Sequence, residues 1–574
     1  MSTFLTAQSL TLSYTSKPLF KALNFTLLRG DKIGLIGHNG CGKSSLLKLL
    51  SGQFEPSQGT IAKANTCLMR YVEQHLPNSL LDHSVLEALA DSLPAEEMWR
   101  AELLLDELGF AYEERSMPVT NCSGGQQMRL LLARAIIHKP DLLLLDEPSN
   151  HLDLPSLIWL EQFLYSWKGS FVLVSHDQTL LDRVTNSTWI MRDQTLHHFS
   201  LPCSLARQAL VEKDAADKLR HASEQKEIDR IEKSAKRLAT WGKVYDNEDL
   251  ARKAKTMFAR KERLEEEQTE LSDGTPWVLD IQGEALPANR LLETMPFSVT
   301  PPNSDHHLFD MVEMRVKSGD RIAVLGSNGC GKSTLLNRLF LHYQADKKPS
   351  ASITFHDRCR LGYYDQSLQQ VNDEDTLGDA LQSFANVTSE VAKRSLIGAG
   401  FEYARHDQKV SSLSGGERAR LLFIGLTLAR YHMLFLDEPT NHLDMEGKEE
   451  LIATLQKFSG ATLLVSHDRS LIEQSCNRFW LVQNGQLTEY LSAEEVYQQI
   501  SNVEPLTRDS SSVETAKPST TETNASCSTE EQLLERLVEL EALLEADLAR
   551  KAKHQKPAMQ QGWRDEIEII SAQL

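Results

Sequence analysis

The chain has 574 residues, of which 41% are hydrophobic and 25% are charged, and its formal net charge is −19. That composition is ordinary for a globular protein, and the length fits about three to four domains. No stretch approaches the ~18 consecutive apolar residues of a membrane span, the N-terminus lacks a signal-peptide pattern, and the cysteines include no Cys-x-x-Cys pair. We therefore expect a cytoplasmic protein with reduced thiols and without a zinc or iron–sulfur site.

A phosphate-binding loop is predicted near the N-terminus. An apolar strand pattern beginning at Ile33 runs into Gly37-x-x-x-x-Gly42-Lys43-Ser44, and an apolar helix pattern follows. In such a loop, backbone N–H groups and a helix N-terminus surround the phosphates, the Lys contacts the β- and γ-phosphates, and the Ser holds Mg²⁺. The loop is therefore expected to bind ATP through Gly37, His38, Asn39, Gly40, Cys41, Gly42, Lys43, Ser44 and Ser45.

Two residues flank this loop at the ends of strand patterns. Tyr14 ends an upstream strand pattern, where its ring is expected to stack on adenine; packing within the strand is the alternative. Gln74 follows a second strand pattern at residues 69–72.

Further motifs predict the catalytic groups. Ser123-Gly124-Gly125-Gln126 precedes a helix pattern, and the apolar strand pattern at 142–145 ends in Asp146 and Glu147. A buried strand that ends in paired acids delivers the first to Mg²⁺ and the second to an attacking water. A later apolar strand pattern leads to His176, which we expect to sense the γ-phosphate.

The same motifs recur in the same order in the second half of the chain. Equivalent residues lie 289 to 292 residues apart, as Lys43 and Lys332, Gln74 and Gln366, and Glu147 and Glu438 illustrate. Such a near-constant offset indicates an internal duplication. The second copy predicts an ATP-binding loop (Gly326, Ser327, Asn328, Gly329, Cys330, Gly331, Lys332, Ser333, Thr334), a Mg²⁺ ligand pair (Ser333, Asp437), a signature (Ser414, Gly415, Gly416, Glu417) and catalytic Glu438 and His467.

Residues 205–271 separate the two copies. Apolar residues at helical spacing and the scarcity of Gly and Pro predict two long helices, and the turn-forming residues 241–247 predict a hairpin. Residues 233–261 contain nine Lys or Arg against three acids, a net charge of +6. A solvated spacer is one interpretation; a basic, aromatic-tipped probe that reaches a phosphate backbone is the other. The predicted RNA contacts are Lys233, Lys236, Arg237, Trp241, Lys243 and Tyr245.

These motifs, their order and their duplication resemble the ABC-F family of tandem ATP-binding cassette (ABC) ATPases. The resemblance covers about residues 4–500 and includes Asp-Glu-Pro-[Ser/Thr]-Asn-His-Leu-Asp at 146–153 and 437–444. It implies an α/β fold with two P-loop nucleotide-binding domains, joined by a helical hairpin, that close on each other within a monomer. It also implies that each signature completes the other cassette's site, pairing Lys43 with Ser414 and Lys332 with Ser123. Gln74 and Gln366 would then contact ATP and its Mg²⁺.

The resemblance further implies a ribosome-associated ATPase whose linker lies near tRNA and contacts ribosomal RNA. Members of the family regulate translation, rescue stalled ribosomes or protect ribosomes from antibiotics. Two alternatives stay open: a DNA-binding or repair ATPase that uses the C-terminal segment, and the energy-coupling subunit of a membrane transporter. The transporter hypothesis has no use for residues 205–271.

The C-terminal region differs in composition from the rest. Residues 503–531 are rich in Ser, Thr and Glu and predict a disordered tether. A leucine repeat before Pro557 and an apolar repeat after it (Trp563, Ile567, Ile570, Leu574) predict a short coiled-coil hairpin. The chain is therefore divided into ABC ATPase domain 1 (1–204), the helical linker (205–271), ABC ATPase domain 2 (272–502), the tether (503–531) and the C-terminal hairpin (532–574).

Overall fold

The structure is a computed structural model that describes residues 2–501, except residues 14–17, 75, 92, 95–96, 151, 245–247, 267, 269–278, 280, 282, 288–289, 302–305, 346–351, 386 and 442. The predicted tether and C-terminal hairpin lie outside the described residues, as do Tyr14 and Tyr245. None of the described helices combines the length and hydrophobicity needed to cross a membrane.

A six-stranded sheet forms the centre of the first cassette, in the order β5-β6-β7-β3-β8-β9. Its strands pair in parallel except for β8 and β9, which form an antiparallel pair at one edge. Every residue of β6 and β7 is buried, as expected for parallel strands covered on both faces. The strands are β3 (Lys32–Ile36), β5 (Met69–Val72), β6 (Leu142–Asp146), β7 (Ser170–Val174), β8 (Ser187–Arg192) and β9 (Thr195–Phe199).

An antiparallel sheet and six α-helices complete this cassette. The sheet has the order β2-β1-β4, with β1 (Thr3–Ser13), β2 (Pro18–Leu28) and β4 (Gln58–Lys63). The core includes the fully buried Leu89, Leu105 and Leu130 from three different helices. The helices are α1 (Lys43–Ser51), α2 (Val85–Ala90), α3 (Met98–Glu107), α4 (Gly124–Ile136), α5 (Leu154–Ser166) and α6 (Gln178–Val184), with 3₁₀ turns at Asn78–Leu80, Tyr112–Ser116 and Val119–Asn121.

The second cassette repeats this arrangement. Its eight-stranded sheet has the order β11-β12-β20-β19-β14-β18-β17-β16, and a small sheet has the order β13-β10-β15. The segment from β16 to β20 repeats the order seen from β5 to β9, so the sequence duplication is also a duplication of strand order. The strands are β10 (Leu292–Thr294), β11 (Phe297–Val299), β12 (Phe309–Met311), β13 (Met314–Val316), β14 (Arg321–Gly326), β15 (Ile353–Phe355), β16 (Leu361–Tyr364), β17 (Met433–Asp437), β18 (Ala461–Val465), β19 (Arg478–Gln483) and β20 (Gln486–Tyr490).

The helices of the second cassette follow the same plan, and a helix again follows the last strand. They are α9 (Lys332–Gln344), α10 (Leu377–Gln382), α11 (Ser389–Gly398), α12 (Gly415–Ala429), α13 (Met445–Lys457), α14 (Arg469–Ser475) and α15 (Ala493–Ser501), with 3₁₀ turns at Tyr403–Arg405 and Val410–Ser412. The predicted α/β fold with two tandem cassettes is therefore confirmed.

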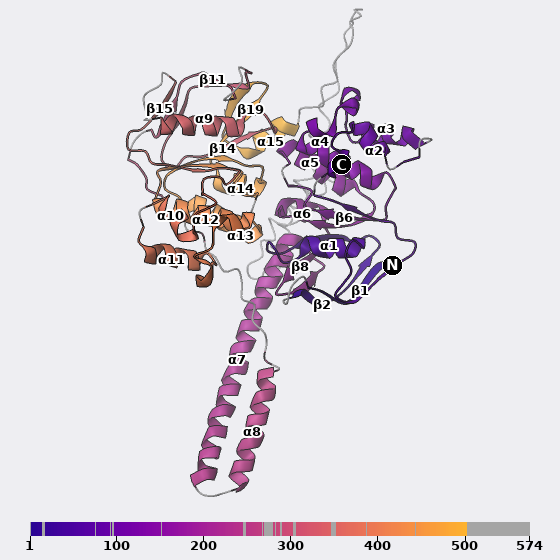
Figure 1. The fold of residues 1–574 in the computed structure, drawn as a ribbon, viewed down its shortest axis with the longest axis vertical. Helices are drawn as coiled ribbons and strands as arrows, with labels where there is room; N and C mark the ends of the chain where they lie inside the picture. The colour runs from indigo at the N-terminus through magenta and orange to yellow at the C-terminus, as the bar shows by residue number, and fades with distance from the viewer. Residues whose placement is uncertain are drawn as a thin grey trace, which may run out of the picture. The chain divides into compact units, whose positions relative to one another are not determined.

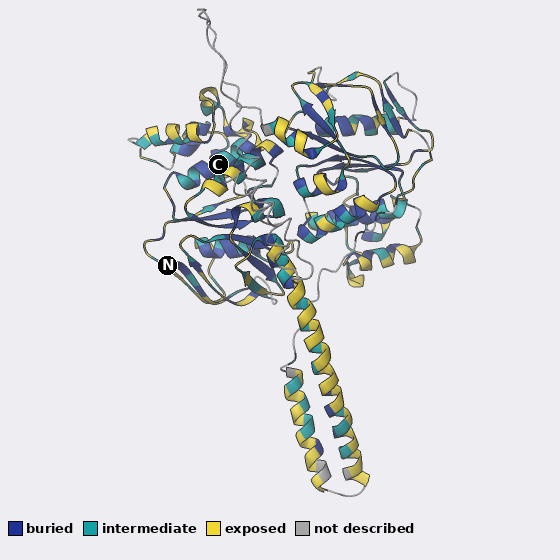
Figure 2. Ribbon diagram, turned by 180° about the vertical axis from the view of Figure 1, so that it is seen from behind, coloured by how far each residue is buried: buried dark blue, intermediate teal, exposed yellow. Residues whose placement is uncertain are grey.

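The linker is a helical hairpin, as the sequence predicts. Helices α7 (Cys203–Val244) and α8 (Glu248–Glu266) lie side by side in both ribbon views, and most of their surface is exposed (Figures 1 and 2). Its small core contains Ile228, Ile231 and Ala235 of α7 and Ala254 of α8. Ion pairs between the two helices join Arg260 to Glu227 at 3.3 Å and Lys261 to Glu232 at 3.7 Å.

Helix α7 begins two residues before the predicted start of the linker. The side chains of Cys203 and Ala206 are fully buried and belong to the hydrophobic core of the first cassette. The first turns of α7 are thus part of the cassette core, and this gives the hairpin a fixed base.

Candidate functional site

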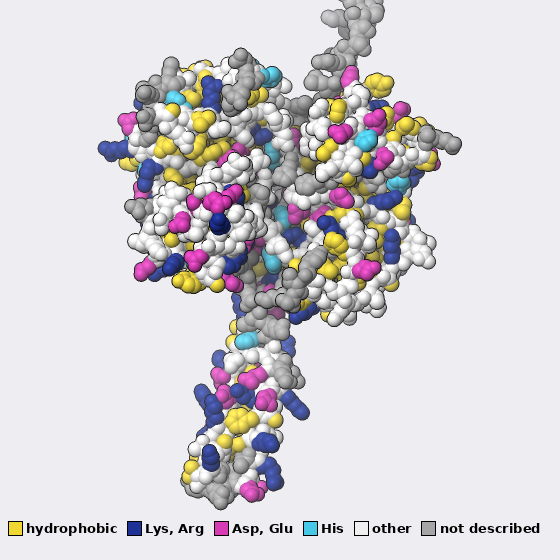
Figure 3. Space-filling view, viewed as in Figure 1, with side chains coloured by type: hydrophobic (Ala, Val, Ile, Leu, Met, Phe, Trp, Pro, Cys, Tyr) yellow, Lys and Arg dark blue, Asp and Glu magenta, His cyan; other side chains and the backbone are white. Residues whose placement is uncertain are grey.

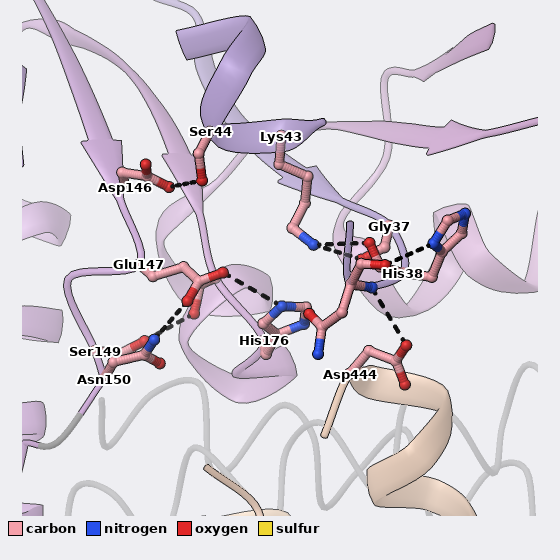
Figure 4. A network of polar contacts seen from close by, with 12 residues as sticks. Gly37, His38, Lys43, Ser44, Asp146, Glu147, Ser149, Asn150, His176 and Asp444 are labelled. Carbon is pink, nitrogen blue, oxygen red and sulfur yellow. Dashed lines mark hydrogen bonds and ion pairs between the residues drawn. The ribbon is translucent and has the colours of Figure 1, made fainter. Parts of the chain in front are cut away.

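The first phosphate-binding loop lies between β3 and α1 (Figure 4). Lys43 is 5% exposed, and its Nζ donates to the backbone carbonyls of Gly37 at 2.8 Å and His38 at 3.1 Å. The residue before the helix, Gly42, has φ +104°, and a Cβ there would lie 2.7 Å from Cδ2 of Leu19. Glycine is therefore required, and the loop turns directly into a helix N-terminus, where an anion is stabilised.

Asp146 ends β6 and is held by two hydroxyl groups. Oγ of Ser44 donates to Oδ1 of Asp146 at 3.0 Å, and the phenol of Tyr71 donates to Oδ2 at 2.9 Å. Burial raises the pKa of Asp146, although both hydrogen bonds oppose that shift. A Ser hydroxyl beside a carboxylate is a donor pair that suits Mg²⁺ together with phosphate oxygens, so these residues fit the ion.

Glu147 has a strained backbone and an ordered side chain. Its φ is +49°, in the left-handed region that non-glycine residues rarely adopt. Nε2 of His176 lies 3.5 Å from Oε1 of Glu147, and the amide of Asn150 donates to Oε2 (Figure 4). Burial alone would raise the pKa of Glu147, but the hydrogen bond and charge of His176, with the charge of Lys43, lower it to about 2. A carboxylate oriented in this way can accept a proton from water.

The second phosphate-binding loop, between β14 and α9, reproduces this geometry. Nζ of Lys332 donates to the carbonyls of Gly326 and Ser327, at 2.9 Å in each case. Oγ of Ser333 donates to Oδ1 of Asp437 at 3.0 Å. The duplication has thus preserved the backbone contacts of the lysine and the hydrogen bond between the serine and the carboxylate.

The second acidic pair differs from the first in its electrostatics. Glu438 has φ +48°, and Nε2 of His467 lies 3.3 Å from its Oε1. The Glu438 side chain is 10% exposed, against 20% for Glu147. Burial raises the pKa of Glu438 to about 8 against the opposing charge of Lys332, and burial with that same charge lowers the pKa of His467 to about 3.

Each cassette sends an aspartate to the phosphate-binding loop of the other. Oδ2 of Asp444, which caps α13, accepts the backbone N–H of Asn39 at 3.4 Å (Figure 4). In the opposite direction, Oδ2 of Asp153, which caps α5, accepts the N–H of Asn328 at 3.0 Å. Both aspartates lie in the His-Leu-Asp motifs, for which no separate role is predicted from the sequence.

Lys332 lines a cavity of about 370 Å³ to which both cassettes contribute residues. Gln366 lines it, as predicted for that site, and so do Leu157, His176 and Lys448. The remaining described residues that line it are Ser149, Asn150, Leu152, Asp177, Asn328, Gly329, Gly331, Ser333, Thr334, Glu438, Thr440, Asn441, Leu443, Val465, His467 and Asp468.

The signature serines cap helices and are exposed. Ser123 opens α4 and Ser414 opens α12, each with a reciprocal hydrogen bond to the residue three positions later. Neither serine is among the described residues that line the cavity at Lys332, and Gln74 is exposed at the end of β5. The pairing of each signature with the opposite lysine therefore stays a prediction.

The residues predicted to contact RNA lie near the end of α7. Lys233, Arg237, Trp241 and Lys243 are exposed, Trp241 by 49%, and Figure 3 shows basic side chains along the hairpin. Lys236 is also exposed, and it pairs with Glu232 at 2.6 Å on the same helix.

Comparison with known proteins shows the family to which the two cassettes belong. The family model described as ABC transporter matches residues 20–150 and 309–441. The probable ATP-binding protein YheS of Escherichia coli K12 is 32% identical over 518 residues, which cover 83% of this chain and 78% of the relative. ABC transporter F family member 4 of Arabidopsis thaliana is 29% identical, over 86% of this chain and 76% of the relative. This chain belongs to the ABC-F family.

Two further proteins are similar to this chain. The ribosome protection protein VmlR of Bacillus subtilis is 29% identical to the ABC-F chain described here, over 86% of this chain and 89% of the relative. An archaeal ribosome recycling factor, aABCE1, in complex with the ribosomal stalk protein aP1, has a TM-score of 0.59 at 17% identity, over 86% of this chain and 92% of that one. At that identity the likeness shows the fold alone.

Proposed function

We propose that this ABC-F protein hydrolyses ATP at two sites, one at each phosphate-binding loop. In the first site, Lys43 and the loop N–H groups bind the phosphates, and Glu147 accepts the proton of the attacking water while His176 orients that carboxylate. Ser44 and Asp146 hold Mg²⁺, which neutralises phosphate charge when it is bound. In the second site the same roles fall to Lys332, His467, Ser333 and Asp437. Glu438 accepts the proton there in its ionised form, which is the minor form at neutral pH because burial raises its pKa to about 8.

We further propose that the α7–α8 hairpin binds ribosomal RNA or tRNA, and that ATP controls this binding. The net charge of +6 over residues 233–261 supports an RNA target, because cations on an exposed helix neutralise phosphates. The aromatic ring of Trp241 near the hairpin end can stack on an unpaired base. The name of the relative VmlR supports the ribosome as the target. The chain would act as a cytoplasmic monomer.

The base of the hairpin carries this proposal, because it contacts both cassettes. Arg192 of β8 donates two hydrogen bonds to Asp214 of α7, at 2.7 and 2.6 Å. Seven residues earlier on α7, Arg207 donates two to Glu449 of α13, one of them at 2.8 Å. Helix α13 is the one that Asp444 caps beside the first phosphate-binding loop. A movement between the cassettes therefore changes the contacts that orient the hairpin.

Hydrolysis is tested by measuring the phosphate that the double variant Glu147→Gln and Glu438→Gln releases from ATP. The variant keeps ATP binding, because glutamine preserves the shape of the side chain, and it loses turnover by about 100-fold or more, the usual contribution of a general base. Turnover close to that of the unmodified protein would contradict the assignment of these two residues.

RNA binding is tested by the triple variant Lys233→Glu, Arg237→Glu and Lys243→Glu on the hairpin. Its affinity for purified ribosomes falls by at least tenfold, and the salt dependence of binding becomes shallower because fewer counterions are released. The matched control reverses the charge of three exposed basic residues outside the hairpin, Lys63, Arg394 and Lys457, by replacing each with Glu. If the two triple variants bind ribosomes with equal affinity, the hairpin is not part of the binding surface.

A further inference from the structure

Lys448 of the second cassette reaches the first ATP site. It lies on α13, four residues after the capping Asp444. Its Nζ donates to the backbone carbonyl of His176 at 3.1 Å and to Oδ2 of Asp468 at 2.7 Å. The side chain is 16% exposed, so both hydrogen bonds are largely shielded from water. One ammonium group thus connects the catalytic histidine loop of the first cassette to the second cassette.

Two capping aspartates give Lys448 a negative environment. Asp468 caps α14 and Asp177 caps α6, each by accepting a backbone N–H from its own helix. Burial and the neighbouring charge of Asp468 raise the pKa of Asp177. Burial alone would lower the pKa of Lys448, but the charges of Asp468, Asp177 and Glu147 raise it. The group is therefore an ammonium ion and a hydrogen-bond donor at neutral pH.

The equivalent position of the first cassette has no charge. The duplication offset that relates Glu147 to Glu438 and His176 to His467 relates Leu157 to Lys448. Leu157 lies on α5, is 4% exposed, and lines the cavity that contains Lys332 and His467. A leucine cannot donate to the carbonyl of a histidine. The two ATP sites consequently differ in the residue that the opposite cassette presents to the histidine loop.

We propose that Lys448 is a positioning residue of the first ATP site and acts from the opposite cassette. By donating to the His176 carbonyl, it fixes the loop so that the imidazole stays against Glu147 when the cassettes close. Catalysis at the first site is then coupled to closing, whereas the second site lacks this connection. The inference rests on the proposed hydrolysis of ATP and extends it to a functional difference between the sites.

The test separates the two sites with single glutamate variants. Glu438→Gln leaves the first site able to hydrolyse ATP, and Glu147→Gln leaves the second. In the Glu438→Gln background, Lys448→Met lowers kcat by about tenfold and changes the KM for ATP by less than about twofold, because the residue orients the catalytic groups without binding the nucleotide. In the Glu147→Gln background, the same substitution changes kcat by less than about twofold. Lys448→Arg restores at least half of the lost rate, since a guanidinium also donates to a carbonyl.

Two controls separate positioning from folding. Lys457→Met removes an exposed lysine from the same helix and leaves kcat unchanged. Lys448→Leu, which copies the residue of the first cassette, gives the same site-selective loss as Lys448→Met. Thermal unfolding of each variant reports whether the cassettes remain folded.

Specific results would overturn the inference. If Lys448 serves only to neutralise Asp468, its substitution slows hydrolysis at the second site as much as at the first, because Asp468 follows His467 in the sequence. An unchanged kcat at the first site would also contradict the proposed role. If Glu147→Gln and Glu438→Gln each left full turnover, the catalytic assignment itself would be wrong, and the inference with it.

Discussion

In the first ATP site Nε2 of His176 lies 3.5 Å from Glu147, and in the second site Nε2 of His467 lies 3.3 Å from Glu438. The loop lysines, the Ser–Asp hydrogen bonds and the left-handed backbone of both glutamates also match. Duplication of the sequence has therefore preserved the contact distances within each site, which are 3.5 and 3.3 Å for His–Glu, 2.8 and 2.9 Å for Lys–Gly, and 3.0 Å in both sites for Ser–Asp.

The surroundings of these groups have diverged. Burial would raise the pKa of Glu147, but His176, Lys43 and Asn150 stabilise its carboxylate and lower the pKa to about 2. Glu438 is more buried, and its pKa is about 8. Lys448 donates to the His176 carbonyl of the first site, and the residue at the equivalent position of the first cassette is Leu157. Equal geometry therefore does not imply equal chemistry, because charge depends on neighbours that the motifs do not include.

Two buried tryptophans show whether the two cassettes are equivalent in packing. Trp189 of β8 and Trp480 of β19 occupy matching positions, and both are fully buried. Replacing either by Ala leaves a cavity in a packed core, and each substitution destabilises its cassette by about 3–5 kcal/mol. Chemical denaturation followed by circular dichroism measures the loss. A difference above about 2 kcal/mol between the variants would show that the two cores are not equivalent.

The next effect compares the catalytic acids directly. Glu147→Gln and Glu438→Gln each lower turnover at their own site by about 100-fold, so each single variant retains only the rate of the other site. Steady-state phosphate release at saturating ATP gives the two rates. Identical residual rates would show that the electrostatic differences between the sites do not affect hydrolysis.

A smaller effect tests whether each signature serves the opposite site. Ser414→Ala removes the cap of α12 and costs about 1 kcal/mol of stability. Made together with Glu438→Gln, it lowers turnover at the first site by about tenfold. Ser123→Ala in the same background costs similar stability and leaves the first site unaffected. The opposite pattern would assign each signature to its own cassette.

The smallest effect concerns the connection between the sites and the hairpin. Arg207→Gln breaks the ion pair with Glu449, which joins α7 to the second cassette. The ratio of ribosome affinities with and without ATP then falls by about fivefold, which corresponds to about 1 kcal/mol of coupling. Titration of labelled protein with ribosomes measures this ratio, and the exchange pair Arg207→Glu with Glu449→Arg restores it. If Arg207→Gln leaves this ratio unchanged, the contact between Arg207 and Glu449 does not couple ATP binding to ribosome binding.

The sequence predicts the features that are local in the chain. The phosphate-binding loops, the acidic pairs and the helical hairpin follow from contiguous motifs and periodicity, and the strand orders agree with the duplication. Tyr71 and Lys448 were not predicted because their contacts are distant in sequence. Tyr71 reaches Asp146 only because β5 pairs with β6, and Lys448 reaches His176 only across the two cassettes.

One experiment tests the central claim, that ATP-dependent closing of the cassettes controls hairpin binding to the ribosome. The double variant Glu147→Gln and Glu438→Gln is centrifuged with purified ribosomes, with ATP and without it. If closing controls binding, ATP moves the protein into the ribosome pellet, and the three charge reversals at Lys233, Arg237 and Lys243 keep it in the supernatant. Equal sedimentation with and without ATP would contradict the claim.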